Sequence, residues 1–284
     1  MVTMNYFERA RKFRAKKRLG QNFLTDESAI ETILDVSDIT KDDIVVEIGP
    51  GLGFVTEQLV NLAKKVYAVE LDEDMVNEIS KLNAPNLEII HQDILKTDLS
   101  QFGKNIKVVA NIPYYITSPI LAHLLGEVDD LENKNRNSIS QVVLMVQYEV
   151  AKRLTADENS PSKEFGLLSI LAQFWSDIEF VRKVPARSFF PAPKVDSAIV
   201  KLTVKKEPLL KLTNYSFFRK VVKGCFATRR KNIKNSLVNV GFAKNAVEKT
   251  LKDLNIDENL RGETLSIKQM GELSENLKGN LWKD

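Results

Sequence analysis

The chain has 284 residues, of which 43% are hydrophobic and 28% charged, with a formal net charge of +3, and this suits one large globular α/β domain plus a small one. It contains no run of 18 or more apolar residues and no secretory signal, so we expect a cytoplasmic protein without a membrane span. One cysteine, Cys225, and two histidines exclude an intramolecular disulfide and a cysteine-cluster metal site, and we expect no metal.

The first 20 residues are strongly basic. They hold seven lysines and arginines and one acid, a net charge of +6, with aromatic side chains interleaved. We interpret residues 1–18 as a flexible arm whose aromatics stack on bases and whose cations neutralise phosphates. The alternative is a solvated charged tail.

A glycine-rich turn follows the first expected strand. Residues 44–48 form a β-branched apolar run typical of a central parallel strand, and Gly49-Pro50-Gly51-Leu52-Gly53 comes next, before a helix over 54–64. Strand, turn and helix in this order predict a nucleotide-type site. Phe54 stands where a dinucleotide fingerprint has glycine or alanine, which favours a ligand without a pyrophosphate.

Acids end or follow the next two expected strands, residues 66–69 and 86–91. Glu70 lies 21 residues after Gly49, where a carboxylate can bind both ribose hydroxyls; the alternative is a helix cap. Asp93 can accept a hydrogen bond from an adenine amine, unless it only forms an Asx turn. The carboxyl ends of parallel strands meet at one sheet edge. Together these groups therefore predict adenosine with a non-phosphate extension, S-adenosyl-methionine.

A fourth strand, residues 106–110, leads into Asn111-Ile112-Pro113-Tyr114 and a helix over 116–125. The asparagine side-chain oxygen and the backbone carbonyl of residue 112 or 113 can each accept one hydrogen of the exocyclic amine of a flat base. Tyr114 can stack on that base. The alternative is an ordinary strand-to-helix turn, in which asparagine and proline are common.

The remaining elements of the first domain come from hydrophobic patterns and breakers. Residues 126–140 are polar and predict a loop with frayed helix ends. Residues 185–195 contain three prolines and predict an extended loop that presents Phe189 and Phe190, although the alternative is burial in the core. Strands are expected over 141–146, 178–184 and 198–204, and helices over 27–36, 149–154 and 165–175.

After residue 208 the pattern becomes helical, with helices expected over 215–226, 231–240, 243–254 and 266–277. We therefore divide the chain into a methyltransferase-like domain, residues 1–206, and a helical domain, residues 207–284. Residues 214–234 carry +7, so the rest of the chain outside the two basic segments carries −10. Two separate basic segments on an acidic body favour binding of a polyanion.

The chain closely resembles the small-subunit ribosomal RNA adenine N6-dimethyltransferases, over about residues 16–275. The shared landmarks keep their order and spacing. They are Leu19 to Leu24, Glu47 to Gly53, Asn111 to Tyr114, Phe189 to Ala198, Cys225 to Asn232 and Arg261 to Ser266.

The resemblance implies an α/β fold. Its core is a Rossmann-like class I S-adenosyl-methionine methyltransferase sheet, mostly parallel with one antiparallel strand near the edge, followed by a small all-helical C-terminal domain. It implies dimethylation of two adjacent adenosines in a hairpin near the 3′ end of 16S ribosomal RNA, on the small ribosomal subunit, by a monomer that takes part in subunit biogenesis.

The resemblance also implies roles for individual residues. The target adenine would meet Asn111, Pro113 and Tyr114, with Phe189 opposite. The cofactor would meet Asn22, Leu24, Gly49, Gly51, Glu70, Asp93 and Asn111. The cations expected to bind RNA are Arg14, Lys16, Lys17, Arg18, Arg219, Lys223, Arg229, Arg230 and Lys231.

Three other functions remain open. The large-subunit adenine methyltransferases that confer macrolide resistance share the Asn-x-Pro-Tyr box. A non-catalytic ribosome-assembly factor would keep the fold alone, and a small-molecule methyltransferase would not need the basic segments. The chain also departs from the family at Tyr115, usually asparagine, and at Tyr148, often lysine.

Overall fold

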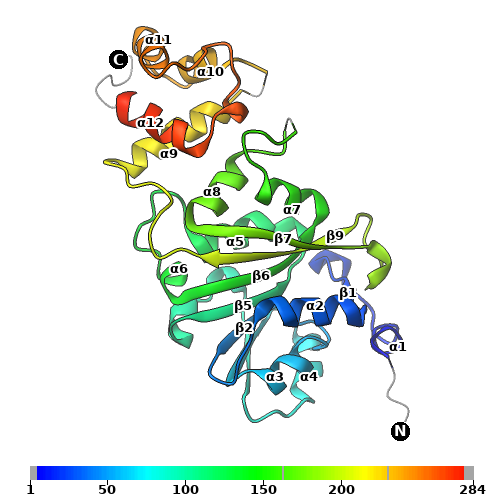
Figure 1. The fold of residues 1–284 in the computed structure, drawn as a ribbon. Helices are drawn as coiled ribbons and strands as arrows, with labels where there is room; N and C mark the ends of the chain where they lie inside the picture. Colours follow the sequence, from blue (N-terminus) through cyan, green and yellow to red (C-terminus); the bar gives the residue numbers. More distant parts are fainter. Residues whose placement is uncertain (1–4, 162, 229, 278–284) are drawn as a thin grey trace. The chain divides into compact units, whose positions relative to one another are not determined.

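Runs of buried apolar residues form the strands of a mixed sheet. The computed structural model describes residues 5–161, 163–228 and 230–277, and within these ranges seven strands pair in the order β4-β3-β2-β5-β6-β9-β7 (Figure 1). The strands are β2 (Ile44–Ile48), β3 (Lys65–Glu70), β4 (Leu87–His91), β5 (Ile106–Asn111), β6 (Ile139–Gln147), β7 (Ser176–Val184) and β9 (Ser197–Val204).

Strand direction confirms the predicted fold class. The neighbouring strands from β4 to β6 pair in parallel, and β9 runs antiparallel to both β6 and β7. The chain order reverses at β2, which lies between β3 and β5. In an open parallel sheet a ligand crevice forms outside the strand ends at such a reversal.

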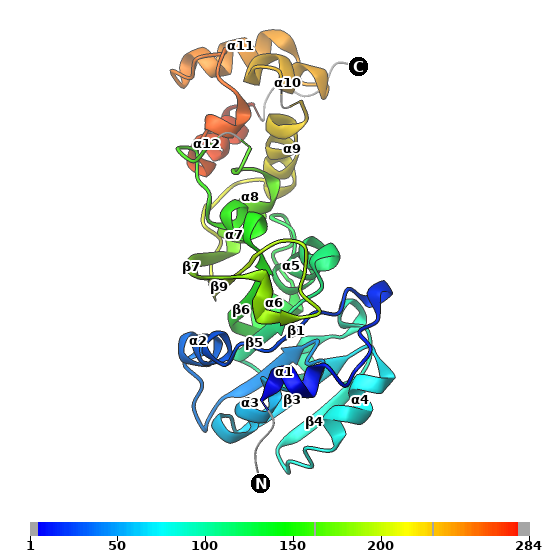
Figure 2. The ribbon, with the colours of Figure 1, turned by 90° about the vertical axis from the view of Figure 1, so that its right-hand side faces the viewer.

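Helices cover both faces of this sheet, and α2 and α5 lie on opposite faces (Figures 1 and 2). Asp26 caps α2 by accepting hydrogen bonds from the N–H groups of Ser28 and Ala29, as expected for a helix that begins at residue 27. The helices of this part are α1 (Tyr6–Ala10), α2 (Glu27–Ser37), α3 (Thr56–Leu62), α4 (Glu73–Ser80), α5 (Thr117–Leu125), α6 (Lys134–Ser138) and α7 (Tyr148–Thr155).

The polar stretch 126–140 is not only a loop, because α6 lies within it. Asn133 caps this short helix by accepting a hydrogen bond from the Arg136 N–H at 2.8 Å. Arg136 is buried and its guanidinium donates to the Leu125 carbonyl at 2.8 Å. The hydrogen bond that the buried Arg136 guanidinium makes with the Leu125 carbonyl stabilises this turn. Local helix propensity does not predict such a bond.

A second, two-stranded sheet was not predicted. β1 (Phe23–Leu24) pairs antiparallel with β8 (Phe189–Phe190), joining segments far apart in the chain. The segment that contains β8 lies in residues 185–195, which we expected to be an extended loop. Two-residue strands are too short for a periodic signal, so only the folded chain defines them.

The basic N-terminal segment is docked rather than flexible over residues 5–18. Tyr6 stacks on Phe54 with ring centroids 4.6 Å apart, and Phe7 packs edge-on against Phe190. The Arg9 guanidinium pairs with the Glu57 carboxylate. The expectation of a free arm with aromatics available for bases is therefore wrong for these residues, and residues 1–4 lie outside the described part.

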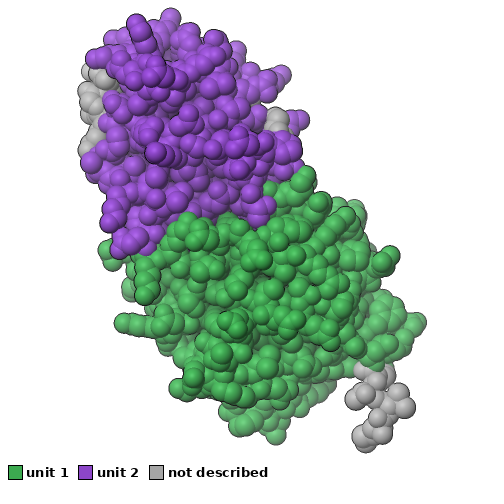
Figure 3. All heavy atoms as spheres, in the orientation of Figure 1, with its two compact units in different colours: residues 1–125, 132–152, 176–206 green, residues 126–131, 153–175, 207–284 purple. Residues whose placement is uncertain are grey.

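The chain forms two compact units (Figure 3). The first comprises the chain up to Leu125, with 132–152 and 176–206, and the second comprises 126–131, 153–175 and the chain from Glu207. The last segment of the second unit starts at Glu207, as the predicted helical domain does, but the unit also includes two segments that we had assigned to the first domain. One of them carries Phe174, which stacks on Phe218 with centroids 5.4 Å apart.

The second unit is helical. The expected C-terminal helices are found, each starting or ending within two residues of its predicted limits, and α8 joins them. They are α8 (Leu167–Trp175), α9 (Tyr215–Phe226), α10 (Ile233–Asn239), α11 (Lys244–Asp253) and α12 (Ile267–Leu277). Among the described helices, none has the length and apolar character needed to cross a membrane.

Candidate active site

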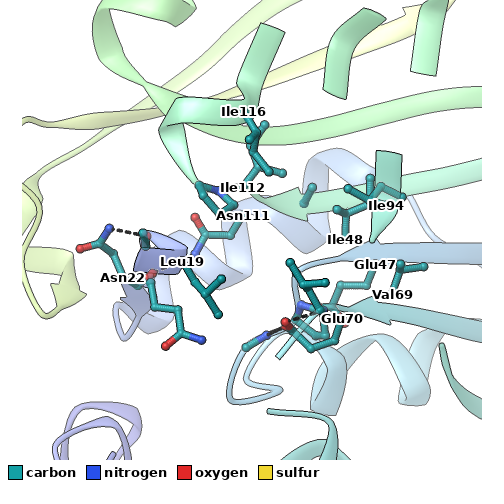
Figure 4. A pocket seen from close by; sticks show the side chains of 18 of the residues that line it. Leu19, Asn22, Glu47, Ile48, Val69, Glu70, Ile94, Asn111, Ile112 and Ile116 are labelled. Atoms are coloured by element: carbon teal, nitrogen blue, oxygen red, sulfur yellow. Dashed lines mark hydrogen bonds between the residues drawn. The ribbon is translucent and has the colours of Figure 1, made fainter. Parts of the chain in front are cut away.

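A pocket opens at the carboxyl ends of β2, β3 and β5, where the chain order reverses. Figure 4 shows Asn111, Asn22 and Leu19 on one side of it and Glu47, Glu70 and Val69 on the other. The predicted residues Asn22, Leu24, Gly49, Gly51, Glu70, Asp93, Asn111, Pro113 and Tyr114 all line it. The sheet therefore brings together side chains that the sequence separates by almost 100 positions.

The charge of the lining selects against phosphate. Three acids, Glu47, Glu70 and Asp93, line the pocket, whereas no lysine, arginine or histidine does so in the described chain. Negative charge on Glu70 and Asp93 would repel a pyrophosphate and attract a cation, whereas the buried Glu47 adds no charge at neutral pH because its pKa is raised to about 8. The lining therefore fits adenosine with a positively charged, non-phosphate extension, as in S-adenosyl-methionine.

The glycine turn lets the backbone approach the ligand. Gly51 has φ +57°, and a Cβ there would meet the Phe23 ring at 3.2 Å. Its N–H donates to the Glu70 carboxylate at 3.2 Å. A side chain at this position would strain the backbone and displace Phe23, so the turn requires glycine.

Glu70 is held at the tip of β3. One carboxylate oxygen accepts hydrogen bonds from the N–H groups of Leu71 and Asp72, both at 2.8 Å, and the other accepts from Gly51. Burial raises the pKa of Glu70, and these backbone donors oppose the rise. The first oxygen already accepts two N–H groups, whereas the second accepts one and keeps a lone pair that can accept a ribose hydroxyl.

Asp93 combines the two interpretations made from the sequence. Its Oδ1 accepts a hydrogen bond from the Leu95 N–H at 3.0 Å and caps a short 3₁₀ turn. The same residue lines the pocket beside Ile94. The cap fixes one oxygen of the carboxylate and leaves the other to accept from an adenine amine.

Asn111 ends β5 with a defined orientation. Its side-chain nitrogen donates to the Asn22 carbonyl at 3.3 Å, which leaves the side-chain oxygen to accept. Of the two backbone carbonyls considered, that of Pro113 already accepts from the Ile116 N–H at 3.1 Å. The Ile112 carbonyl has no hydrogen bond within the described part of the chain, so it is the better second acceptor.

The two predicted aromatics differ in position. Tyr114 lines the pocket, and its hydroxyl hydrogen-bonds the Ser197 Oγ at 2.6 Å, which fixes the ring. Burial raises the pKa of Tyr114 and the bond from Ser197 opposes this. Phe189 does not line the pocket: it is 2% exposed in β8 and belongs to the core. The structure therefore does not bring Phe189 opposite Tyr114, and the alternative of core burial describes it.

Among the pocket residues without a predicted role, Glu47 and Tyr115 differ most from their surroundings. Glu47 is buried within an apolar strand, where it had no predicted role, and it accepts a 2.6 Å hydrogen bond from the Thr56 hydroxyl. Burial raises its pKa to about 8. Tyr115, noted from the sequence only as a departure from the family, is 64% exposed at the pocket. A charged residue inside a central strand was the one available signal for Glu47.

The predicted RNA-binding cations fall into two groups. Lys16 pairs with Asp72 and Asp74, and Arg219 pairs with Glu127 and Asp129, so both are engaged within the protein. Arg229 lies outside the described residues. The others are exposed: Arg14, Lys17, Arg18, Lys223, Arg230 and Lys231.

Within the described ranges, histidine, cysteine, aspartate and glutamate side chains form no group of three that could hold a metal ion. Cys225 is buried in α9, and burial raises its pKa to about 12. A thiol with this pKa is not a nucleophile or a metal ligand at neutral pH.

Comparison with known proteins adds an independent observation. The model of the family described as ribosomal RNA adenine dimethylase matches residues 12–278. A protein named ribosomal RNA small subunit methyltransferase A from Clostridium botulinum is 41% identical over 270 residues, covering 93% of this chain and 94% of the relative. A protein of the same name from Clostridium perfringens is 40% identical over 268 residues, covering 93% and 90%.

Solved structures agree with this. A dimethyladenosine transferase from Plasmodium falciparum superposes with a TM-score of 0.76 at 29% identity, covering 92% of this chain and all of that one. A 23S rRNA methyltransferase, ErmE, gives a TM-score of 0.69 at 29% identity, covering 90% of this chain and all of that one. With an acidic pocket and an Asn-Ile-Pro-Tyr box at the reversal point of its sheet, the chain belongs to the ribosomal RNA adenine dimethylase family, whose model matches residues 12–278.

Proposed function

We propose that this protein transfers methyl groups from S-adenosyl-methionine to the N6 amines of two adjacent adenosines in a hairpin near the 3′ end of 16S ribosomal RNA. The substrate is the small ribosomal subunit or a precursor of it in the cytoplasm, and the enzyme acts as a monomer. The single observation that carries the chemistry is the orientation of Asn111, whose amide nitrogen is occupied by the Asn22 carbonyl while its oxygen remains an acceptor beside Pro113.

Glu70, Asp93 and the glycine turn would hold the methyl donor, which supplies a methyl group already activated on a sulfonium sulfur. An adenine N6 amine is a poor nucleophile, because its lone pair is delocalised into the ring. The Asn111 oxygen and the Ile112 carbonyl accept the two amine hydrogens and favour a tetrahedral nitrogen whose lone pair is directed at the methyl group. Orientation of two reactants in this way can lower a barrier by about 7–11 kcal/mol.

Tyr114 replaces the stacking that the target base loses when it leaves the RNA. Extrusion of a base costs a few kcal/mol. The Ser197 hydroxyl holds the Tyr114 ring in place by a 2.6 Å hydrogen bond, so the ring offers a fixed face. Phe189 is left out of this proposal because of its burial.

RNA binding is assigned to the exposed cations of both basic segments. In the N-terminal segment these are Arg14, Lys17 and Arg18, and in the helical unit they are Lys223, Arg230 and Lys231. Each exposed cation can contact a phosphate and release a counterion, which makes affinity fall with salt.

A large-subunit substrate is the second candidate, because the ErmE structure is also similar to this chain. The small subunit is favoured by the higher identity, 41%, to proteins named small subunit methyltransferase A. A non-catalytic assembly factor would not need the oriented Asn111 and the acidic pocket.

Methyl transfer to isolated ribosomal subunits tests the proposal. Radiolabelled S-adenosyl-methionine and small subunits from cells that lack the modification should yield dimethyladenosine in 16S RNA. Label in large-subunit RNA alone would indicate a large-subunit methyltransferase of the ErmE type. Cofactor binding without methylation of either subunit would favour a non-catalytic assembly factor.

Asn111→Ala should reduce methyl transfer at least a thousandfold, because the amine loses its oriented acceptor, while RNA affinity stays within twofold. Product formation is measured by radiolabel and RNA affinity by filter binding. Asn77→Ala, an exposed asparagine on α4, is the matched control and should behave as wild type. Equal loss of binding and catalysis in Asn111→Ala would contradict the catalytic role.

A further inference from the structure

Residues 16–24 form a strap along one side of the active-site pocket. Leu19 to Leu24 line the pocket, and the Asn22 carbonyl accepts the hydrogen bond that orients Asn111. Any displacement of the strap therefore opens the ligand site and releases the catalytic asparagine together. What fastens the strap decides how long a ligand stays.

The N-terminal end of the strap is fastened by polar contacts to the buried carboxylate of Asp72, and the exposed Asp74 is a second partner of Lys16 at 2.6 Å. The Asp72 side chain is 2% exposed. The Lys16 Nζ lies 2.5 Å from its Oδ1, and the Gln21 Nε2 donates to its Oδ2 at 2.6 Å. Lys16 also donates its backbone N–H to the Gln21 side-chain oxygen at 2.7 Å, so the two residues support each other.

Asp72 connects this fastening to the ligand site. Its backbone N–H donates at 2.8 Å to the carboxylate of Glu70, the residue assigned to the ribose. Burial alone would raise the pKa of Asp72, but the hydrogen bonds from Lys16 and Gln21 hold it below its usual value. The carboxylate therefore stays charged and keeps attracting Lys16 at neutral pH.

The other end of the strap is fastened differently. Phe23 and Leu24 are 5% and 4% exposed and pair with β8, and the Thr25 N–H donates to the Ser188 carbonyl at 2.8 Å. Apolar burial and backbone pairing at this end do not depend on salt, whereas the Lys16 side chain is 30% exposed to solvent ions. The polar end is thus the one that opens first.

We propose that Lys16 and Gln21 are positioning residues that hold the strap closed through Asp72 and set the rate at which spent cofactor leaves. The inference rests on the proposed function, because each adenosine needs two methyl transfers and each transfer needs a fresh methyl donor. In every transfer the bond from sulfur to the methyl carbon breaks with its electron pair left on sulfur, the N6 lone pair forms a bond to that carbon, and N6 loses one proton to water. S-adenosyl-homocysteine must then depart before the next round. Lys16 is thereby assigned to this fastening and not to RNA.

Release of labelled S-adenosyl-homocysteine from the full chain, chased with excess unlabelled compound, tests the proposal without RNA. Lys16→Met and Gln21→Ala should each release the label about three- to tenfold faster than wild type. Lys16→Arg keeps the charge and should restore a rate within twofold of wild type. Lys64→Met, the same change of charge at an exposed position outside the strap, is the matched control and should also stay within twofold.

Salt dependence supplies a readout that a purely structural role would not move. Wild-type release should accelerate several-fold between 50 mM and 500 mM salt, and Lys16→Met should respond much less. Equal release from wild type, Lys16→Met and Gln21→Ala would overturn the role of the fastening while leaving the proposed function intact. Failure of wild type to retain the compound at all would instead overturn the proposed function.

Discussion

At the scale of single residues, burial without a charged partner is the most informative feature of Glu47. It is 3% exposed, its one hydrogen bond found in the described chain comes from Thr56, and Glu70 adds repulsion. Desolvation is the main cause that raises its pKa from 4.5 to about 8. The folded protein therefore carries a proton here between these pH values, and the unfolded chain does not.

This difference predicts a direction for stability against pH. Because the folded state binds more protons, Glu47 makes the free energy of unfolding fall as pH rises from 4.5 to about 8, by at most about 1.4 kcal/mol per pH unit. Glu47→Gln keeps an acceptor for Thr56 and removes the titration. Urea denaturation at pH 5 and pH 8.5 should show the variant gaining stability relative to wild type at the higher pH. Parallel pH profiles of the two proteins would contradict the buried, protonated carboxyl.

Gly20 is a second position where a single atom matters. Its φ is +63°, and a Cβ would lie 3.2 Å from the Tyr115 ring and 3.3 Å from the Pro113 Cβ. Gly20→Ala should therefore lose about 1–2 kcal/mol of unfolding free energy and weaken cofactor binding, since the strap would shift. Gly166→Ala is the control, because a Cβ there meets nothing within 4 Å. Denaturant midpoints measure the stability of the two variants, and cofactor titration measures their affinity for the cofactor. Wild-type stability and affinity in Gly20→Ala would contradict the close packing at the strap.

At the scale of elements, α1 shows how aromatic and charged residues dock a short helix. A five-residue helix is not stable alone, so its contacts must hold it. Tyr6 stacks on Phe54 and accepts a hydrogen bond from Gln58 at 3.1 Å, and the Arg9 guanidinium lies 4.8 Å from the Phe54 ring centroid. These contacts cover the start of α3 with the N-terminal segment.

Tyr6→Ala should undock this helix. The loss of the stacked pair predicts about 1–2 kcal/mol lower stability and faster tryptic cleavage after the basic residues between 9 and 18. Lys12→Ala, at an exposed position in the same segment, should leave the unfolding midpoint unchanged. If Tyr6→Ala were cleaved at the wild-type rate, the other contacts of α1 would be sufficient to keep this helix docked.

At the scale of the whole molecule, the cations that remain exposed are the ones that we propose for RNA binding. Lys223 and Lys231 are exposed in the second basic segment, whereas Arg219 is tied to Glu127 at 3.0 Å and to Asp129 at 3.5 Å. Cations of equal formal charge therefore have different roles, one structural and two available to RNA.

Salt-dependent RNA binding distinguishes these roles. Lys223→Gln with Lys231→Gln should weaken binding and lower the slope of log affinity against log salt by about 2, with an unchanged unfolding midpoint. Arg219→Gln should leave that slope unchanged and lower stability by about 1 kcal/mol, because two acids lose their partner. The reverse pattern would contradict the assignment of the exposed cations.

The parallel strands, the glycine turn and the position of acidic residues at the strand ends could all be predicted from the sequence alone. β-branched apolar runs, caps and turn residues act over a few positions, so they can be recognised without the fold. The sequence also predicted that Asn111, Glu70 and Asp93 lie close together, because parallel strands bring their carboxyl ends to the same edge of a sheet.

Which of the remaining side chains are exposed, and which are engaged within the protein, follows only from the tertiary structure. Lys16 and Arg219 found acidic partners, Phe189 entered the core, and residues 5–18 docked on the first unit. These outcomes depend on contacts between positions tens of residues apart, up to more than 160 in the pairing of β1 with β8. A short-range sequence pattern cannot identify such partners. A charged or aromatic residue has the same sequence neighbours whether its side chain contacts solvent, an acidic residue or the core.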